Sequence, residues 1–189
     1  MIETVATPVV ALKPSLNNHY LSNKETAIVV SLIFSVAPKV VAEFGVQLGK
    51  TARSILDATP TIETYIGIDV PWGYKTKLAC QRSEVPSTAG MYARGDDRFK
   101  LLILPYGSLV LETEDLEPLD AAFIDGDHSE VAVVADSVLV RNLLRPGGII
   151  VWHDYGNPGV EVTAALERLN NLGWPIKHVE NTWLAFMRI

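Results

Sequence analysis

The sequence predicts an α/β protein, a three-layer sandwich in which helices cover both faces of a mostly parallel sheet. Two observations lead to this prediction. Short runs of strand-forming residues alternate along the chain with segments whose apolar residues recur at helical spacing. One strand candidate, residues 119–125, is apolar along nearly its whole length, which is typical of a strand buried on both faces of a parallel sheet.

Length and composition limit what the chain can be. Its 189 residues suit a single domain, and 48% apolar with 20% charged residues is an ordinary globular composition. The formal net charge of -6 disfavours general nucleic-acid binding, which depends on basic groups that neutralise phosphates. Cys80 is the only cysteine, which excludes an internal disulfide and a cysteine-rich metal site.

Residues 1–37 are expected to form an N-terminal arm and a helix that precede the main domain. Ser22 starts a Ser-x-x-Glu pattern with Glu25, the form of a capping box at a helix start. The apolar run that follows stops at Pro38 and is shorter than the roughly 20 residues that span a membrane. The chain does not open like a signal peptide, so we expect a cytoplasmic protein without a membrane partner. The apolar helix could supply the face of a homodimer.

The main domain, residues 38–189, is expected to alternate strands with helices. The expected strands are residues 40–44, 65–70, 100–104, 119–125, 148–153, 176–179 and 182–187, and the expected helices are residues 49–58, 127–145 and 158–172. The last two strands follow each other without a helix between them. They should therefore be antiparallel neighbours, because parallel pairing needs a long crossover. Residues 71–98, rich in glycine and proline, receive no assignment.

Residues that directly follow the strands are the first candidates for ligand binding in such a sheet. After the first strand, Gly45 and Gly49 bracket a tight turn into a helix, where a ligand could approach the backbone closely. Their Gly-x-x-x-Gly spacing is neither that of a dinucleotide-binding turn nor that of a phosphate-binding loop. A plain strand-to-helix turn is the alternative interpretation.

Two polar residues at the next strand ends indicate a nucleoside. Asp69 ends the second strand, where a carboxylate can accept hydrogen bonds from ribose hydroxyls, although it could equally be a solvated loop carboxylate or a helix cap. After the third strand, Ser108 lies in a small polar turn that could line an adenine pocket or be a simple loop.

Carboxylates and imidazoles gather after the fourth and fifth strands. Asp125 and His128 follow the fourth strand, and His153 and Asp154 follow the fifth. If these strands are neighbours, Asp125 and Asp154 converge, and converging carboxylates suit a hard divalent cation such as Mg²⁺. His128 or His153 could instead act as a general base near neutral pH. Asp127 has a simpler interpretation, as the cap of the helix that follows it.

The four tryptophans are candidates for ligand contact or for structural anchoring. Tryptophan more often anchors a core or an interface than stacks on a substrate. Trp72 and Trp152 follow strands near the presumed mouth of the site, so these two are the candidates for ligand contact.

These motifs resemble those of the class I S-adenosylmethionine-dependent methyltransferases, in particular methyltransferase family 24. They are similar, more distantly, to those of the cation-dependent catechol and caffeoyl-coenzyme-A O-methyltransferases. The resemblance covers about residues 38 to 189 and is strongest in VAEFGVQLGKTA (41–52), YIGIDV (65–70) and the stretch from LDAAFIDGDH to VWHDY (119–155). It implies a Rossmann-like seven-stranded sheet with an antiparallel last strand. It also implies the cofactor S-adenosyl-L-methionine at the ends of the first strands.

The resemblance further implies cofactor-binding roles for single residues. Glu43, Gly45 and Gly49 would surround the methionine part of the cofactor. Asp69 would bind the ribose hydroxyls, and Ser108 would lie by the adenine.

The same resemblance implies a catalytic and metal-binding site. Asp125 would be the first metal ligand and would also border the cofactor. In the cation-dependent relatives a lysine base lies three residues later, where this chain has His128. Those enzymes carry an Asp-Asn or Asp-Asp pair after the fifth strand, and this chain has His153 and Asp154 there. We therefore predict His128 and Asp125 as catalytic residues and Asp125, Asp154 and His153 as metal ligands.

These features together predict methyl transfer from S-adenosyl-L-methionine to an oxygen of a small molecule or a saccharide. The sulfonium makes the methyl group electrophilic, so the protein has to align the reactants and remove a proton. One alternative is a nicotinamide oxidoreductase, which the missing third glycine disfavours. The other is a non-catalytic S-adenosylmethionine-binding or assembly protein that keeps the fold.

Overall fold

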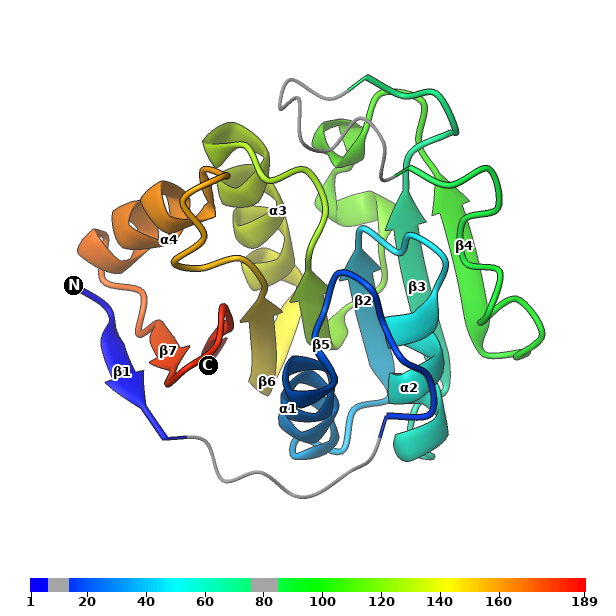
Figure 1. The fold of residues 1–189 in the computed structure, drawn as a ribbon, viewed down its shortest axis with the longest axis horizontal. Helices are drawn as coiled ribbons and strands as arrows, with labels where there is room; N and C mark the ends of the chain where they lie inside the picture. The colour runs from blue at the N-terminus through cyan, green and yellow to red at the C-terminus, as the bar shows by residue number, and fades with distance from the viewer. Residues whose placement is uncertain (7–13, 76–84) are drawn as a thin grey trace.

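The structure, a computed structural model, describes residues 1–6, 14–75 and 85–189 of the chain (Figure 1). The strands are β1 (Glu3–Val5), β2 (Val40–Phe44), β3 (Thr64–Asp69), β4 (Phe99–Ile103), β5 (Leu119–Ile124), β6 (Leu144–Trp152), β7 (Lys177–Val179) and β8 (Ala185–Arg188). The helices are α1 (Asn23–Phe34), α2 (Lys50–Ala58), α3 (Glu130–Leu143) and α4 (Val162–Asn171), with the short 3-10 turns η2 (Ser108–Val110) and η3 (Thr113–Asp115). Cys80, and parts of the arm and of segment 71–98, lie outside the described residues.

All eight strands belong to one sheet, in the order β1-β7-β8-β6-β5-β2-β3-β4. Every neighbouring pair is parallel except the two pairs that include β8. β7 and β8 are antiparallel neighbours, as their short connection predicted. The mostly parallel α/β sheet with an antiparallel last strand is thereby confirmed.

Each face of the sheet has its own apolar core. α1 and α2 pack with Val41 on one face, and α3 and α4 pack with Ala42 and Phe44 on the other (Figure 1). Neighbouring β2 residues belong to different cores because side chains of a strand alternate between the faces. All five β2 residues are therefore buried, which confirms the three-layer sandwich.

The number of strands differs from the seven that the resemblance implied, because the structure describes eight. The additional strand is β1, which pairs in parallel with β7 at one edge of the sheet. Ile2, just before β1, is only 6% exposed and belongs to the core beneath α3 and α4. A strand of three residues is too short to show a period along the sequence, so only the tertiary structure identifies it.

α1 begins as predicted, and its apolar surface lies inside the chain. The Ser22 side chain accepts a hydrogen bond from the backbone N–H of Glu25, and the Glu25 carboxylate accepts one from Ser22. Val29 and Ile33 are fully buried between the helix and the sheet. The apolar surface of α1, which was the candidate for a dimer face, therefore packs against the sheet of the same chain. None of the described helices, α1 included, has the length and apolar character needed to cross a membrane.

The starts of α3 and α4 differ from the prediction. α3 begins at Glu130 with Ser129 as its N-cap, and Asp127 instead accepts a hydrogen bond from the Ser129 backbone N–H. α3 ends at Leu143, and β6 follows without a turn. α4 begins four residues later than expected, because the side chain of Asn157 is hydrogen-bonded to Asp154 and Gly159 in the loop before it.

Candidate active site

A cavity opens beyond the carboxyl ends of the central strands. It lies where the chain, after building β2, β3 and β4 toward one edge, returns to build β5 and β6 on the other side of β2. Its volume is about 430 Å³, within the usual size of small-molecule sites. Residues that follow five different strands line it, namely Gly45, Asp69, Ser108, Asp125 and Asp154.

Four of the six residues predicted to bind the cofactor line this cavity: Gly45, Asp69, Ser108 and Asp125. Glu43 and Gly49 are not among the lining residues. Glu43 is 1% exposed and accepts a hydrogen bond of 3.0 Å from the Tyr65 hydroxyl. Burial raises the pKa of the Glu43 carboxyl well above its ordinary value, against the effect of the Tyr65 hydrogen bond.

The turn between β2 and α2 requires glycine for packing reasons. A Cβ on Gly45 would overlap the carbonyl oxygen of Asp125, because the turn crosses the loop after β5 at backbone contact. A Cβ on Gly49 would lie 2.9 Å from the Cα of Gly90. Both glycines also have positive φ, 84° and 82°. The sequence analysis explained these glycines by a ligand that approaches the backbone closely. In the structure, the group that approaches the backbone is another part of the protein backbone.

Asp69 holds this turn in place from the end of β3. Its Oδ2 accepts hydrogen bonds from the backbone N–H groups of Val46 and Gln47, at 3.0 and 2.7 Å, and its Oδ1 accepts one from Val70 at 2.7 Å. Burial raises the pKa of the Asp69 carboxyl, and these three hydrogen bonds oppose the rise. Each carboxylate oxygen can accept about two hydrogen bonds, so Oδ1 retains capacity toward the cavity.

Beyond Asp69 the cavity ends at η2 and α3, where Ser108 faces a buried acid that the sequence interpretation missed. Asp136 of α3 is 2% exposed and lines the cavity. Burial raises the pKa of its carboxyl to about 7, Ser108 lowers it by hydrogen bonding, and the charge of Asp127 raises it further. An aspartate on the buried stripe between Val133 and Val140 was the available signal. We call Gly45, Asp69, Ser108 and Asp136 the turn end of the cavity.

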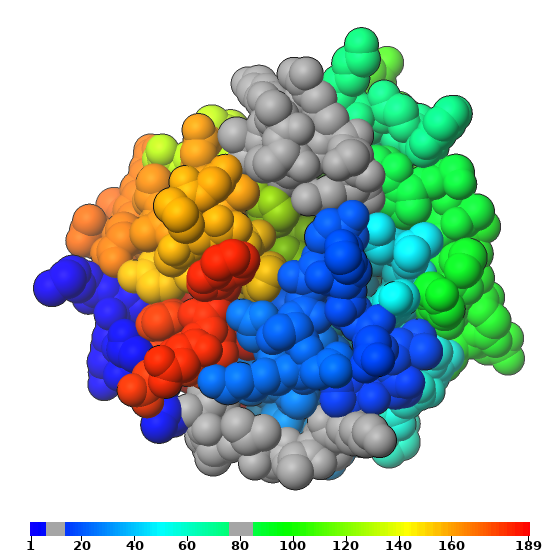
Figure 2. Space-filling model, in the orientation of Figure 1, coloured from blue at the N-terminus to red at the C-terminus, as the bar shows by residue number. Residues whose placement is uncertain are grey.

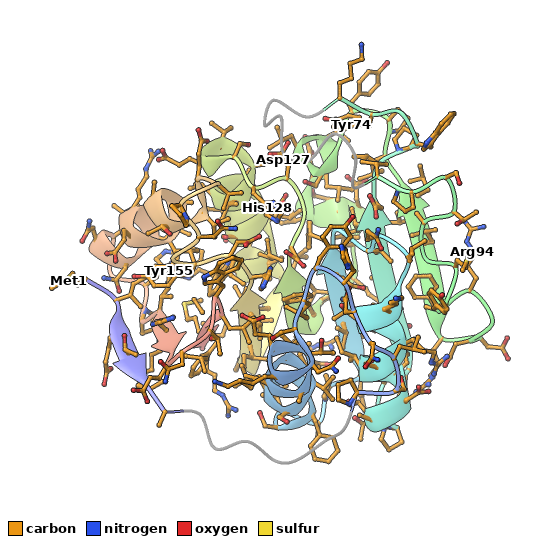
Figure 3. All side chains as sticks on the ribbon, in the orientation of Figure 1. Met1, Tyr74, Arg94, Asp127, His128 and Tyr155 are labelled. Atoms are coloured by element: carbon orange, nitrogen blue, oxygen red, sulfur yellow. The ribbon has the colours of Figure 1, made fainter. Side chains whose placement is uncertain are left out.

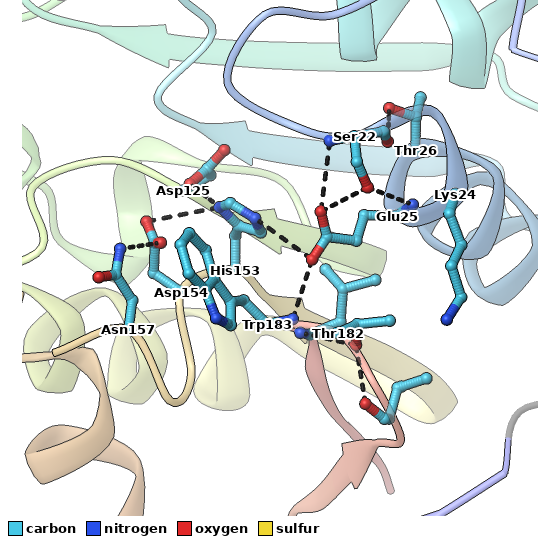
Figure 4. Close-up of polar contacts among 12 residues, drawn as sticks. Ser22, Lys24, Glu25, Thr26, Asp125, His153, Asp154, Asn157, Thr182 and Trp183 are labelled. Carbon is cyan, nitrogen blue, oxygen red and sulfur yellow. Dashed lines mark hydrogen bonds and ion pairs between the residues drawn. The ribbon is translucent and has the colours of Figure 1, made fainter.

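At the other end four side chains form an acid–imidazole cluster: Asp125, His128, His153 and Asp154. Figure 4 labels Asp125, His153 and Asp154, and Figure 3 labels His128. His128 Nε2 lies 3.2 Å from Asp125 Oδ1 and 3.3 Å from Asp154 Oδ2. His153 Nδ1 lies 3.2 Å and 3.4 Å from the same two oxygens. Both imidazoles thus bridge both carboxylates. The convergence follows from the parallel pairing of β5 with β6, which the sequence interpretation assumed.

The charges of the cluster shift each other's pKa values. Burial alone would lower the pKa of His153, but the charges and hydrogen bonds of Asp125 and Asp154 outweigh it and raise that pKa to about 10. The same carboxylates raise the pKa of His128 against burial. In return, the imidazoles hold the pKa of Asp125 well below its ordinary value, although burial acts in the opposite direction. The cluster therefore favours the ionised form of its carboxylates and the protonated form of its imidazoles.

Two residues that the sequence interpretation did not select support the cluster (Figure 4). The Asn157 side-chain amide donates a 2.7 Å hydrogen bond to Asp154 Oδ1. Asp154 itself has a positive φ of 64°, an uncommon backbone conformation for a residue other than glycine. On the opposite side, Glu25 Oε1 lies 4.0 Å from His153 Nε2 and accepts a 2.9 Å hydrogen bond from the backbone N–H of Trp183.

Trp183, rather than either tryptophan selected from the sequence, lines the cavity. It is 45% exposed, whereas Trp152 is fully buried and donates a 2.9 Å hydrogen bond to the Ser137 hydroxyl. Trp72 is 75% exposed and is not a lining residue. The alternation of β6 turns Trp152 into the sheet core, so its position at the end of the strand was misleading.

The segment before α1 forms a wall of the cavity. Asn18 and Tyr20 line it, and the Asn18 side chain donates a 3.0 Å hydrogen bond to Thr51 at the start of α2. Lys50 Nζ donates to the carbonyl oxygen of Asn17 at 2.8 Å. In Figure 2 this segment and α1, in blue, lie beside the C-terminal strands, in red. Residues that the sequence analysis assigned to the N-terminal arm therefore border the site.

Asp125, His128 and Asp154 could also hold a metal ion. One ligand atom from each lies within 4.8 Å of the others. Two carboxylates and one imidazole fit a divalent cation. The set predicted from the sequence contained His153 in place of His128, and His153 Nδ1 faces the same two carboxylate oxygens.

Comparison with known proteins gives one family and several solved structures with the same fold. A family model described as "Methyltransferase domain" matches residues 42–155. No curated protein sequence matches the chain. The cofactor-bound structure of Rv0187 from MTB has a TM-score of 0.65 and 17% identity, with 93% of this chain and 84% of that chain covered.

Two further solved structures have the same fold. The structure of the Podospora anserina methyltransferase PaMTH1 bound to SAH has a TM-score of 0.64 and 14% identity, covering 88% of this chain and 78% of that chain. The O-methyltransferase TomG from Streptomyces achromogenes, in complex with SAM, has a TM-score of 0.61 and 16% identity, covering 89% and 82%. At these identities the likeness concerns the fold alone.

Proposed function

The chain belongs to the methyltransferase domain family, and from this premise we propose that it transfers a methyl group from S-adenosyl-L-methionine to an oxygen of a small molecule or a saccharide. One observation carries the proposal. A single cavity joins Asp69 and Ser108 at the turn end to Asp125, His128 and Asp154 in the acid–imidazole cluster. Such a cavity can bind a nucleoside at one end and an acceptor at the other. Solved structures with this fold include O-methyltransferases in complex with SAM or SAH, which supports the same assignment.

The turn end would hold the cofactor. The remaining acceptor capacity of Asp69 Oδ1 suits a ribose hydroxyl, and the Gly45 turn exposes backbone close to the cavity. S-Adenosyl-L-methionine supplies a methyl group on a positively charged sulfur. The carboxylates of Asp69 and Asp125 border the cavity and suit a cation there.

The acid–imidazole cluster would orient the acceptor and take up its proton. In a metal-independent version, the neutral form of His128 receives the proton of the acceptor hydroxyl, and Asp125 and Asp154, which lie beside its Nε2, stabilise the imidazolium that results. In a cation-dependent version, Asp125, His128 and Asp154 hold a divalent ion such as Mg²⁺, which would lower the pKa of a bound hydroxyl. Trp183, Tyr20 and Asn18 would then border the acceptor.

Isothermal titration calorimetry tests the cofactor part of the proposal. Wild-type protein should bind S-adenosylmethionine and S-adenosylhomocysteine, and Asp69→Ala should weaken both by at least about tenfold, because hydrogen bonds to a charged group are lost. Asp57→Ala, an exposed carboxylate on α2 that does not line the cavity, is the matched control. Absence of binding by the wild type, or equal effects of the two variants, would count against the proposal.

Methyl transfer to a panel of phenols, catechols and saccharides tests the chemistry. With wild-type protein and a cofactor labelled in its methyl group, a methylated product that carries the label should form. Transfer that continues undiminished in excess EDTA would refute the cation-dependent version. Tight cofactor binding without turnover across the panel would favour a non-catalytic binding protein with this fold.

A further inference from the structure

We propose that the carboxylate of Asp136 accepts a hydrogen bond from the exocyclic amine of the cofactor's adenine, and so determines which base the cavity binds. The proposal rests on the proposed function, since it assigns a residue within the site for S-adenosylmethionine. Asp136 belongs to α3, outside the strand-end turns that supply the other cofactor residues.

Asp136 is a buried acid whose hydrogen bonding is incomplete. It is 2% exposed, and among the described residues its Oδ1 has no hydrogen-bond partner. The described residues also give it no ion pair, and the carboxylate of Asp127 repels its ionised form. A buried carboxyl oxygen without a partner destabilises a fold, so such groups usually have a ligand or a functional role.

The position of Asp136 along the cavity assigns it to the base. The acid–imidazole cluster lies at the end where the methyl group has to meet the acceptor. Asp69, in the middle, is the acceptor for ribose hydroxyls. Ser108 follows β4, which lies on the far side of β3 from β5 and β6, and Asp136 is hydrogen-bonded to Ser108. Both residues line the cavity, and they therefore lie beyond Asp69, where the base of a nucleoside would lie.

The chemistry of this end distinguishes adenine from other purines. Adenine carries at its position 6 an amine that donates hydrogen bonds, and the Asp136 carboxylate can only accept when ionised. Hypoxanthine and guanine carry a carbonyl oxygen at that position, which a carboxylate would repel. The hydroxyl of Ser108 donates its one hydrogen to the Asp136 carboxyl, and so holds the carboxylate that would face the amine. The raised pKa of Asp136, about 7, is consistent with a carboxyl that lacks its ligand.

A double-mutant cycle between protein and ligand tests the proposal. Calorimetry would compare S-adenosylhomocysteine with an analogue in which hydrogen replaces the exocyclic amine. Wild-type protein should prefer the amine by about tenfold to a hundredfold, the range for a hydrogen bond to a charged group. Asp136→Ala should bind both ligands with affinities equal within about a factor of two. Asp136→Asn keeps an acceptor oxygen and should retain an intermediate preference.

The control is Thr59→Val. Thr59 is also fully buried, and its hydroxyl has no partner among the described residues, but it does not line the cavity. This variant should keep the wild-type preference, which would show that removal of a buried polar group does not by itself change the ratio.

The outcomes separate this proposal from the proposed function. If wild-type protein binds S-adenosylhomocysteine and the amine-free analogue equally well, the role of Asp136 is refuted while the methyltransferase assignment stands. If both Asp136 variants keep the wild-type preference for the ligand with the amine, the role of Asp136 is likewise refuted and the methyltransferase assignment stands. If wild-type protein binds neither ligand, the proposed function fails and the role of Asp136 fails with it. Should Asp136→Ala not fold, the wild-type ratio and Asp136→Asn still decide.

Discussion

The two ends of the cavity differ in what holds them in place. At the turn end, the backbone of the Gly45 turn touches the loop after β5, and Asp69 fixes it through three backbone N–H groups. In the acid–imidazole cluster, side chains hold each other through charge, with His128 and His153 both bridging the same two carboxylates. The turn end therefore depends on backbone packing, and the acid–imidazole cluster depends on charge balance. Mutations at the turn end should therefore mainly change the stability of the fold, and mutations in the cluster should mainly change pKa values and activity.

The largest effect is expected where backbone meets backbone. Gly45→Ala places a methyl group onto the Asp125 carbonyl oxygen at a φ of 84°, so it should destabilise the fold by roughly 4–5 kcal/mol or more. Gly147→Ala is the control, because Gly147 has a φ of 83° and nothing within 4 Å of an added Cβ. That variant should lose only about 1 kcal/mol. Urea denaturation measures both, and similar losses would contradict the packing argument for the turn end.

The second effect concerns the pH dependence of stability at the turn end. The Asp136 carboxyl has a pKa of about 7 in the folded protein, above its ordinary value of 3.8, so it disfavours folding increasingly as pH rises from 3.8 to 7. Asp136→Asn lacks this titration. It should match wild-type stability near pH 4 and exceed it at pH 8 by up to about 4 kcal/mol. Thermal denaturation at the two pH values measures the difference, and a pH-independent difference would argue against the buried carboxyl.

The third effect tests charge balance in the acid–imidazole cluster. Because the pKa of His153 is raised from 6.5 to about 10, its contribution to stability is complete below pH 6.5 and is lost as pH rises to about 10. Asp125→Asn should lower that pKa and reduce methyl transfer by about a hundredfold, and it should weaken cofactor binding less than Asp69→Ala does. NMR titration of the His153 ring measures the pKa. A His153 pKa that stays near 10 in Asp125→Asn would show that another group holds the proton.

The smallest effect is expected at the contact between α1 and the cluster. Ser22→Ala removes the side-chain acceptor of the capping box and should destabilise the protein by about 1 kcal/mol. Glu25 keeps its hydrogen bond to Trp183, so cofactor affinity should stay at the wild-type level. Chemical denaturation and calorimetry measure the two quantities. A loss of cofactor affinity in this variant would mean that the start of α1 positions the cavity.

Sequence patterns predicted the residues at strand ends better than the residues on helices. Asp69 and Asp125 were identified because a strand that ends in a carboxylate is a local pattern. Asp136 was missed because it lies within a helix whose neighbouring positions are apolar, where no local rule marks a cavity. The contact of Asn157 with Asp154 was missed, because an asparagine before a proline fits the cap of the following helix as well as it fits a loop that orients Asp154.

The sequence by itself determined the alternation of strands and helices, the capping box of α1 and the carboxylates and imidazoles at the strand ends. These depend on spacing over a few residues, and such spacing reflects local backbone geometry. Only the tertiary structure decided that β1 extends the sheet, that Glu25 and Trp183 reach the acid–imidazole cluster, and that Asp136 faces Ser108. These contacts join residues far apart in the chain, and the packing of helices on the two faces of the sheet sets them.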